Sequence, residues 1–243
     1  MAKVVLVASG KGGAGKTTVC AFLGEALAAR NRRTLLVELD SGLRALDVAL
    51  RVTETLVFDL GDVMRGSCKT REAICSCPFQ KNLSVICAAA KPAAVPATAI
   101  SELAAELAGE YDFILLDCPA GIGYELAYAA AASDEALIVV TPDPASMRGA
   151  RAASDAMRAI GLTDLRLVVE RCPRKPKQLS PLENLDQVID GAGVQLVGVI
   201  WEDAKTRAAA ASGTALPEDS PNKKMFSDLA SRLCGERVPL DFK

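Results

Sequence analysis

Residues 10–17 read Gly-Lys-Gly-Gly-Ala-Gly-Lys-Thr and match the phosphate-binding pattern G-x-x-x-x-G-K-T at every fixed position. A short apolar run at residues 4–8 precedes the motif, and a helical pattern at residues 17–30 follows it. Strand, glycine-rich loop and helix in this order form an anion site, because backbone N–H groups and the positive end of the helix point at the phosphates. The motif therefore predicts a nucleotide-binding α/β fold.

The loop residues have distinct predicted roles in holding a nucleotide. Lys16 is placed to reach the β- and γ-phosphates, and the Thr17 hydroxyl is placed to bind Mg²⁺. Lys11 is a second lysine inside the loop, and it can reach across an interface to a nucleotide that a partner holds. The predicted nucleotide-binding residues of this segment are Gly10, Lys11, Gly12, Gly13, Ala14, Gly15, Lys16, Thr17 and Thr18.

Composition narrows the chemistry that can act on this nucleotide. The 243-residue chain contains no histidine, which excludes imidazole acid–base catalysis and Ser-His or Cys-His nucleophiles. Its net charge is −2, so no general affinity for nucleic acid is expected. Catalysis must therefore use carboxylates, lysines, backbone amides and a bound metal ion.

The segment at the start of the chain and the cysteines indicate where the protein works. Met1 is followed within two residues by the first predicted strand, with no apolar leader, and no apolar run approaches membrane-spanning length. The eight cysteines are scattered through predicted strands and helices, and we expect reduced thiols rather than disulfides. We expect a cytoplasmic protein, peripheral to the inner face of the cell membrane where an anchor is present.

Short apolar segments alternate with longer helical patterns along the whole chain. This alternation predicts one α/β domain over residues 1–243, with a mostly parallel, twisted sheet of about seven or eight strands and helices on both faces. The segment 171–177 carries basic residues between prolines and is predicted to be an exposed loop. Strands are predicted at 3–8, 34–39, 83–87, 112–117, 135–140, 165–169 and 195–200, and helices near 17–30, 56–65, 96–109, 123–132, 145–160, 181–190, 203–211 and 222–234.

Acidic residues end two of the predicted strands. The run 35–40 closes with Glu38 and Asp40, and the apolar run 113–116 is followed by Asp117. Ligands of parallel sheets bind at the carboxyl ends of the strands. We therefore expect Asp40 and Asp117 to bind Mg²⁺ through water, next to Thr17.

The chain resembles the MinD/ParA group of ATPases, whose phosphate-binding loop carries the same second lysine. Residues 41–47 resemble the G-L-R-N-L-D segment of its MinD-type members, and residues 117–122 resemble their D-S-P-A-G-I segment. Residues 197–203 resemble V-G-V-I-P-E-D, and residues 213–217 fall where the group has G-x-P-V or a similar segment. The match extends from about residue 2 to about residue 239, with consistent spacing.

The resemblance implies a P-loop NTPase fold and Mg²⁺-dependent hydrolysis of ATP to ADP and phosphate. It implies a spatial regulator of cell-division site placement that cycles on a membrane with its nucleotide state. Lys11, Lys16 and Asp40 are the implied catalytic residues: Lys11 acts on the partner's nucleotide in an ATP-dependent homodimer, and Asp40 orients the attacking water. Asp117 is the implied Walker B acid, residues 119–121 are switch II, and further implied nucleotide contacts are Arg171, Trp201, Glu202 and Asp203.

The resemblance also implies partners. They are a MinC-like inhibitor and a MinE-like or other activator, with residues 146–151 near the partner-binding helix, and no specific nucleic acid is expected. Relatives bind anionic membrane through a C-terminal amphipathic helix. Residues 237–243, with Pro239 among them, cannot form that helix, so we expect either a shortened sequence or a member without the anchor.

Three positions depart from the group's pattern. Glu38 stands where members usually carry Asp, and Glu170 stands where many carry an Asn that contacts adenine. Trp201 replaces a Pro beside the base, where it would either stack on adenine or form part of the core.

Other functions on the same scaffold stay open at this stage. One is a flagellar-number or ParA-like partition ATPase. Another is a metal- or Fe–S-delivery ATPase, because the thiols of Cys75 and Cys77, with Cys68 nearby, could bridge a soft metal across a dimer.

Overall fold

A single sheet runs through the computed structural model, which describes residues 1–41, 44–91, 95–174 and 184–240. Within these residues the sheet has eight strands in the order β3-β4-β2-β5-β1-β6-β7-β8, and every pairing is parallel except β3–β4. The predicted fold class is confirmed. The strands are Lys3–Ala8 (β1), Thr34–Glu38 (β2), Cys75–Ser76 (β3), Leu83–Ile86 (β4), Phe113–Asp117 (β5), Glu135–Val140 (β6), Leu165–Cys172 (β7) and Gln195–Trp201 (β8).

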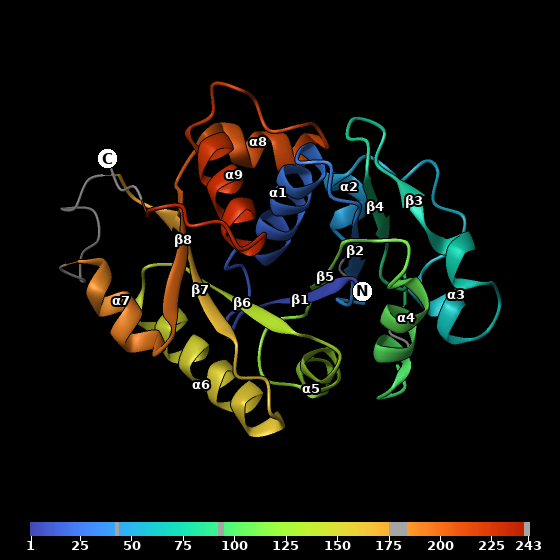
Figure 1. Cartoon of the computed structure of the whole chain (residues 1–243), viewed down its shortest axis with the longest axis horizontal. Coiled ribbons are helices and arrows are strands. Elements are labelled where there is room, and N and C mark those ends of the chain that lie inside the picture. Colours follow the sequence, from blue (N-terminus) through green and yellow to red (C-terminus); the bar gives the residue numbers. More distant parts are fainter. Residues whose placement is uncertain (42–43, 92–94, 175–183, 241–243) are drawn as a thin grey trace.

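Helices cover both faces of the sheet. In Figure 1, α1, α8 and α9 lie above the strands, and α5, α6 and α7 lie below them. No described helix is both long and apolar enough to cross a membrane. The helices are Lys16–Ala29 (α1), Leu46–Ala49 (α2), Leu60–Met64 (α3), Ala99–Leu107 (α4), Tyr124–Ala131 (α5), Pro144–Ile160 (α6), Leu185–Ala192 (α7), Ala204–Ser212 (α8) and Pro221–Leu233 (α9), with a 3₁₀ turn at Thr70–Ala73.

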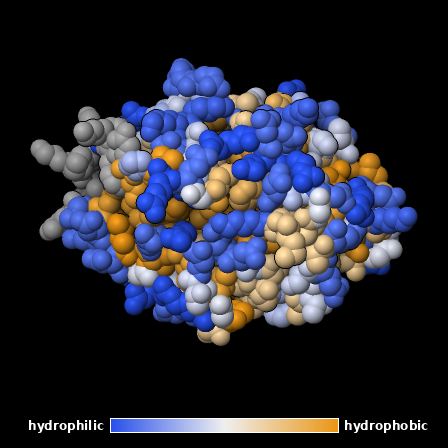
Figure 2. Space-filling view, viewed as in Figure 1, coloured by the Kyte–Doolittle hydropathy of each residue, from blue (hydrophilic) through white to orange (hydrophobic). Residues whose placement is uncertain are grey.

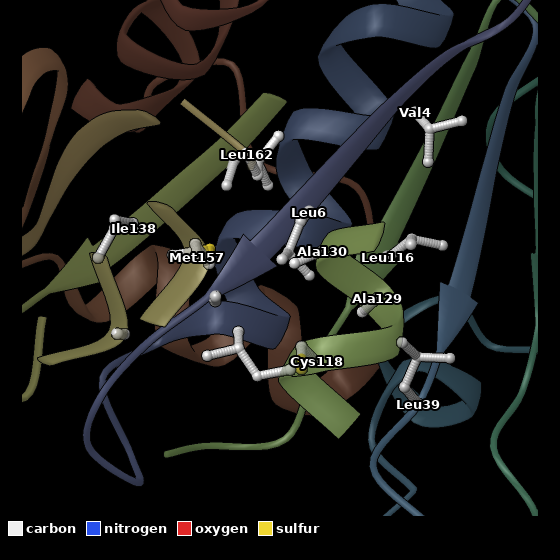
Figure 3. Close-up of a cluster of buried hydrophobic side chains, with 14 of the residues drawn as sticks. Val4, Leu6, Leu39, Leu116, Cys118, Ala129, Ala130, Ile138, Met157 and Leu162 are labelled. Atoms are coloured by element: carbon white, nitrogen blue, oxygen red, sulfur yellow. The ribbon is translucent and has the colours of Figure 1, made fainter. Parts of the chain in front are cut away.

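The sheet separates two hydrophobic clusters. Alternate residues of β1 point to opposite faces, so Leu6 packs into the cluster under α5 and α6, while Val7 packs against α1 and α9. Figure 3 shows Leu6 and Ile138 from the strands gathered with Ala129 of α5 and Met157 of α6. The outer surface seen in Figure 2 is mostly hydrophilic, with smaller hydrophobic patches.

Strand register brings the predicted site residues to one edge. Val7 of β1 and Glu38 of β2 both pair with Asp117 of β5. The loop after β1 is tied to the segment after β5, because the Gly121 N–H donates to the Ser9 carbonyl at 2.9 Å. The glycine-rich loop, Glu38 and Asp117 therefore meet at the carboxyl ends of three neighbouring strands.

Several predicted boundaries were wrong for local reasons. Helix α3 begins at Leu60 rather than near 56, because Asp59 and Asp62 form a reciprocal capping box. Strand β7 extends to Cys172, so Arg171 and the buried Cys172 belong to the sheet rather than to the predicted basic loop. Residues 175–177 of that loop and 181–183 of the predicted 181–190 helix lie outside the described residues.

Candidate functional site

The glycine-rich loop depends on two different properties of glycine. Gly13 and Gly15 have φ values of +71° and +93°, in the left-handed region that side chains rarely adopt. Gly10 instead touches Gly149 of α6: a Cβ on Gly10 would lie 1.9 Å from the Gly149 carbonyl carbon. The loop ends at Lys16, the first residue of α1, which is only 8% exposed.

A cavity of about 390 Å³ lies beside this loop, within the usual size range of a small-molecule site. It brings together ten of the predicted site residues, from the loop, the segment after β2 and the ends of β7 and β8. Lys11, Gly10, Gly12, Ala14 and Asp117 are not among its lining residues. The lining residues are Gly13, Gly15, Lys16, Thr17, Thr18, Asp40, Glu170, Arg171, Trp201, Glu202, Asp203, Thr206 and Arg207.

Asp117 is a buried carboxylate without a partner. It is 1% exposed, and neither oxygen has a hydrogen bond within the described protein. Burial raises the pKa of Asp117 to about 7; the Thr17 hydroxyl acts in the opposite direction, Glu38 adds to the rise and Lys16 opposes it. Such a group needs a cation or ordered water, and the oxygen donors of Thr17, Asp40 and Asp117 are the kind that Mg²⁺ prefers. The residues therefore fit a magnesium site.

Glu38 lies beside Asp117 on the neighbouring strand, and both of its carboxylate oxygens accept hydrogen bonds from the protein. Its Oε1 accepts the N–H groups of Ala45 at 2.7 Å and Leu46 at 3.1 Å, and its Oε2 accepts that of Ala88 at 3.2 Å. Burial raises the pKa of Glu38, and these three N–H groups act to lower it. Glu38 thus fastens the start of α2 and the segment after β4 to the end of β2.

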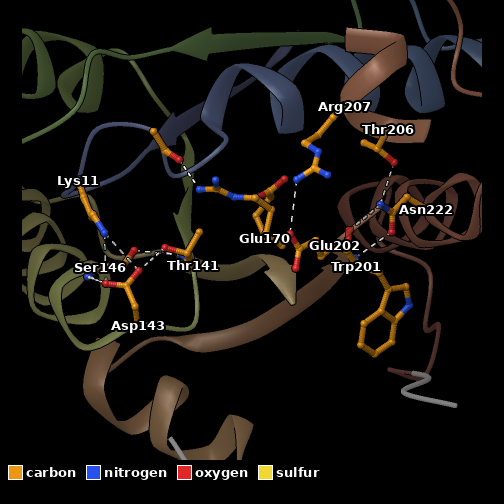
Figure 4. Close-up of polar contacts among 12 residues, drawn as sticks. Lys11, Thr141, Asp143, Ser146, Glu170, Trp201, Glu202, Thr206, Arg207 and Asn222 are labelled. Atoms are coloured by element: carbon orange, nitrogen blue, oxygen red, sulfur yellow. Dashed lines mark hydrogen bonds and ion pairs between the residues drawn. The ribbon is translucent and has the colours of Figure 1, made fainter. Parts of the chain in front are cut away.

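Lys11 lies on the outside of the loop and contacts its own chain. Its Nζ is 3.3 Å from Oδ1 of Asp143, and its side chain remains about half exposed (Figure 4). Asp143 also caps α6 by accepting the N–H groups of Ala145 and Ser146, and the Thr141 hydroxyl donates to it. Although burial opposes this, the Thr141, Ser146 and Lys11 donors lower the pKa of Asp143.

Glu170 and Arg171 form the wall of the cavity on the side of β7. Arg171 Nε donates to Glu170 Oε2 at 2.9 Å, and its guanidinium also donates to the Gly13 carbonyl. A Cβ on Gly15 would lie 2.7 Å from the Glu170 carboxyl carbon. Burial raises the pKa of Glu170 to about 7, and Arg171 acts to lower it. The two residues therefore contact the glycine-rich loop at Gly13 and Gly15 and support its position.

A polar network fixes the end of β8. The Trp201 N–H donates to Asn222 Oδ1 at 2.8 Å, and Asn222 Nδ2 donates back to the Trp201 carbonyl at 2.9 Å. Asp203 caps α8 by accepting the Thr206 N–H, and Arg207 lies 3.5 Å from Glu202. In Figure 4 the half-buried Trp201 ring points away from Glu170 and Arg207, and its stacking on adenine stays a prediction.

Sequence reasoning missed some of these residues. Asp143, Thr206, Arg207 and Asn222 were not in the predicted set. Asp143 had a recognisable signal, because an Asp followed by Pro is a common start of a helix. Asn222 had none, since its partner Trp201 is 21 residues away.

Within the described part of one chain the cysteines are not arranged as a metal site. All eight are free, and the side chains of Cys75 and Cys77 pack into the cluster beneath α1, at 8% and 6% exposure. Burial raises the pKa of both thiols, which disfavours the thiolate that a metal needs. Across the described ranges no three His, Cys, Asp or Glu residues are grouped to hold a metal ion by themselves.

Comparisons with known proteins agree with this geometry. The family model described as "AAA domain" matches residues 2–165. The chain is 33% identical to the septum site-determining protein MinD of Bacillus subtilis (strain 168), with 99% of this chain and 92% of that protein covered. MinD in the MinC:MinD cell division protein complex of Aquifex aeolicus is 29% identical, with a TM-score of 0.90 over 99% of this chain and 98% of that one. MinD of Pyrococcus horikoshii OT3 complexed with Mg-ADP is 28% identical, with a TM-score of 0.84 over 96% of each chain.

Proposed function

The chain belongs to the MinD family of P-loop ATPases, and from this premise we propose that it regulates where the division septum forms and works as an ATP-dependent homodimer. Its reaction is the hydrolysis of ATP to ADP and phosphate, and ATP, ADP and Mg²⁺ are its ligands. The proposal treats residues 1–243 as one ATPase domain. The observation that carries it is the glycine-rich loop beside the buried, unpartnered carboxylate of Asp117.

In this proposal each residue supplies position or charge rather than covalent chemistry. Lys16 binds the β- and γ-phosphates, Thr17 and Asp117 hold Mg²⁺, and Asp40 orients the attacking water. Mg²⁺, when bound, neutralises the charge that develops on the phosphate oxygens. The nearly buried position of Lys16 and the place of Asp40 in the cavity wall support these roles.

Two variants test the catalytic assignment. Lys16→Ala should abolish binding of MgATP, and Asp40→Ala should keep binding while losing most turnover, measured by calorimetry and phosphate release. Lys81→Ala, on an exposed turn far along the chain, is the matched control. Unchanged ATP affinity in Lys16→Ala would overturn the loop assignment, and rapid turnover in Asp40→Ala would remove Asp40 from the mechanism.

Homodimerisation is supported by the surface beside the loop. The Lys11 side chain is about half exposed, so exchanging its contact with Asp143 for a partner's phosphate costs little. Ile122 and Tyr124 are 60% and 59% exposed in the segment that Gly121 ties to the loop. Exposed apolar groups beside an exposed cation are typical of a surface that a second chain covers.

The trans role of Lys11 has its own test. In an Asp40→Ala background, sedimentation with MgATP should give a dimer, and the additional change Lys11→Ala should leave a monomer that still binds ATP. A stable dimer without Lys11 would refute the assignment. The Lys81→Ala change in the same background serves as the control.

Partners follow from the proposed function. The complex of the Aquifex relative with MinC supports a MinC-like inhibitor for this chain, and we extend the proposal to a MinE-like or other activator. Cycling on an anionic membrane is proposed for a gene product that carries a C-terminal amphipathic helix. Co-sedimentation of that gene product with anionic liposomes in ATP but not ADP would support it, and pelleting in neither would count against it.

No second function has comparable support. A flagellar-number or partition role would use the same ATPase site, and no described feature favours either one. The buried positions of Cys75 and Cys77 disfavour metal or Fe–S delivery through these thiols.

A further inference from the structure

A second cavity, of about 730 Å³, lies between α1 and α9, outside the nucleotide cavity. The two cavities share one wall residue, Trp201, which is the only tryptophan of the sequence. The other lining residues come from α1 and the residue after it, from Arg174 after β7, from the segment before α9 and from α9 itself. They are Phe22, Glu25, Ala26, Ala29, Arg30, Arg174, Leu216, Glu218, Ser220, Pro221, Lys223, Lys224, Met225, Phe226 and Ser227.

Part of the wall of this α1–α9 cavity is apolar. Phe22 and Phe226 pack with their ring centroids 5.6 Å apart, and Leu216 and Met225 belong to the same hydrophobic cluster. Trp201 adds a half-buried aromatic wall. A cavity of this size with aromatic walls is suited to the apolar body of a small ligand.

The buried acidic group of the cavity wall, Glu25, is already satisfied by the protein. Glu25 is 7% exposed; its Oε1 accepts from Lys223 Nζ at 2.9 Å and its Oε2 accepts the Leu216 N–H at 3.1 Å. This pair joins α1 to α9 and leaves no acid that must be neutralised by a ligand.

The rim of the cavity is cationic. Arg30, Arg174 and Lys224 line it, and the exposed Glu218, the second acid among the described lining residues, pairs with Lys223 Nζ at 3.2 Å. Arg30 contacts Glu236 and Lys224 contacts Asp228; one side chain of each pair is at least half exposed, so an anionic ligand can compete with these acids for the two cations. The positive rim contrasts with the net charge of −2 of the chain.

We propose that the α1–α9 cavity is an effector site for an organic anion with an apolar body and a single acidic group. The apolar body occupies the space between Phe22, Trp201 and Met225, and the acidic group meets the Arg30, Arg174 and Lys224 rim. The site goes beyond the ATPase function. A ligand in this site would affect the nucleotide cavity through Asn222. Asn222 accepts the Trp201 N–H and also donates to the Thr206 hydroxyl at 2.9 Å, and Thr206 lines the nucleotide cavity.

Dodecanoate tests the site in the nucleotide-free protein. It should bind at one saturable site by calorimetry and change Trp201 fluorescence, whereas dodecyltrimethylammonium, with the opposite charge, should bind at least tenfold more weakly. Both are used below their critical micelle concentrations. Equal binding of the two amphiphiles, or no saturable binding of dodecanoate, would overturn the proposal.

Paired variants locate the binding. Ala26→Phe fills the cavity and should weaken dodecanoate binding at least tenfold; Arg174→Glu reverses one rim charge and should weaken it about fivefold. The controls are Ala105→Phe on the exposed side of α4 and Lys81→Glu, which should leave the affinity unchanged. If Ala26→Phe does not fold, Arg174→Glu alone tests the location. Unchanged dodecanoate affinity in Arg174→Glu would show that dodecanoate binds elsewhere.

The effector role rests on the proposed ATPase function and has a separate readout. Saturating dodecanoate should change the Kd of MgADP at least threefold, and MgADP should change the dodecanoate Kd by the same factor. Saturable dodecanoate binding with an unchanged MgADP Kd would refute the effector role alone. A protein that binds no MgADP at all would instead refute the proposed function, and the binding measurements would still test the site.

Discussion

At the scale of single residues, two neighbouring carboxylates differ in their hydrogen bonding. Glu38 and Asp117 are register partners on β2 and β5. Glu38 accepts three backbone N–H groups, and Asp117 accepts none within the described protein. One residue is therefore part of the scaffold and the other is available to a ligand, a distinction that hydrogen-bond partners make and residue type does not.

Glu38→Gln should destabilise the protein without changing any residue that lines the nucleotide cavity. An amide can accept with one oxygen only, so its NH₂ group would face a backbone N–H donor. We expect a loss of about 1–3 kcal/mol in the free energy of unfolding, measured by urea titration. Glu54→Gln, at an exposed position, should be neutral, and equal stability of the two variants would contradict the scaffold role.

Glu170 should make stability depend on pH. Because its pKa rises from the ordinary 4.5 to about 7, its ionised form favours the unfolded state. The resulting loss in the free energy of unfolding is absent below pH 4.5. It grows as the pH rises to 7, where it reaches on the order of 3 kcal/mol. Between pH 5 and pH 8 the wild-type protein should therefore lose stability relative to Glu170→Gln, and a pH-independent difference would contradict the assignment.

At the scale of elements, the glycine-rich loop rests on helix α6. Gly10 and Gly149 touch through their backbones, and Asp143 at the start of α6 holds Lys11. The glycine-rich loop and α6 are therefore in direct backbone contact at Gly10 and Gly149, with no side chain between them.

Gly149→Ala should weaken MgADP binding although Gly149 does not line the nucleotide cavity. A Cβ at Gly149 would lie 2.8 Å from the backbone of Gly10, so the loop must shift. We expect at least a tenfold rise in the Kd of MgADP by calorimetry. Gly109→Ala, whose Cβ would meet nothing within 4 Å, is the matched control, and similar affinities in the two variants would show that the loop tolerates the shift.

Sequence patterns predicted the long elements and the loop but not the short ones. Val/Ile/Leu runs and the G-x-x-x-x-G-K-T motif are local signals, so β1, α1 and β5 were found almost to the residue. Strand β3 has two residues and α2 has four, and each forms through distant contacts: pairing with β4 and the Glu38 carboxylate. The partners of Lys11, Arg171 and Trp201 were beyond prediction for the same reason.

At the scale of the whole molecule, the exposed apolar surface beside the loop matters most. Ile122 and Tyr124 are solvent-exposed in the single chain, next to the loop that carries Lys11. In the proposed dimer both would be covered, so ATP would control how much apolar surface the protein exposes.

Ile122→Arg should block the ATP-dependent dimer without loss of MgADP binding. Burying an unpaired charge in an interface costs several kcal/mol, enough to shift the monomer–dimer equilibrium by orders of magnitude. Sedimentation of the variant in an Asp40→Ala background gives the readout. Ile160→Arg changes an exposed isoleucine at the far end of α6 and should leave the dimer intact. Dimerisation of Ile122→Arg would place the interface elsewhere.

The buried carboxylate of Asp117 also has a consequence for how long the molecule lasts. A fold that encloses a carboxyl group without a protein partner relies on its ligands for part of its stability, by mass action. Stripped of magnesium and nucleotide, it should open more often and be digested faster by proteases. In a cell, the nucleotide supply would then set the abundance of this protein as well as its activity.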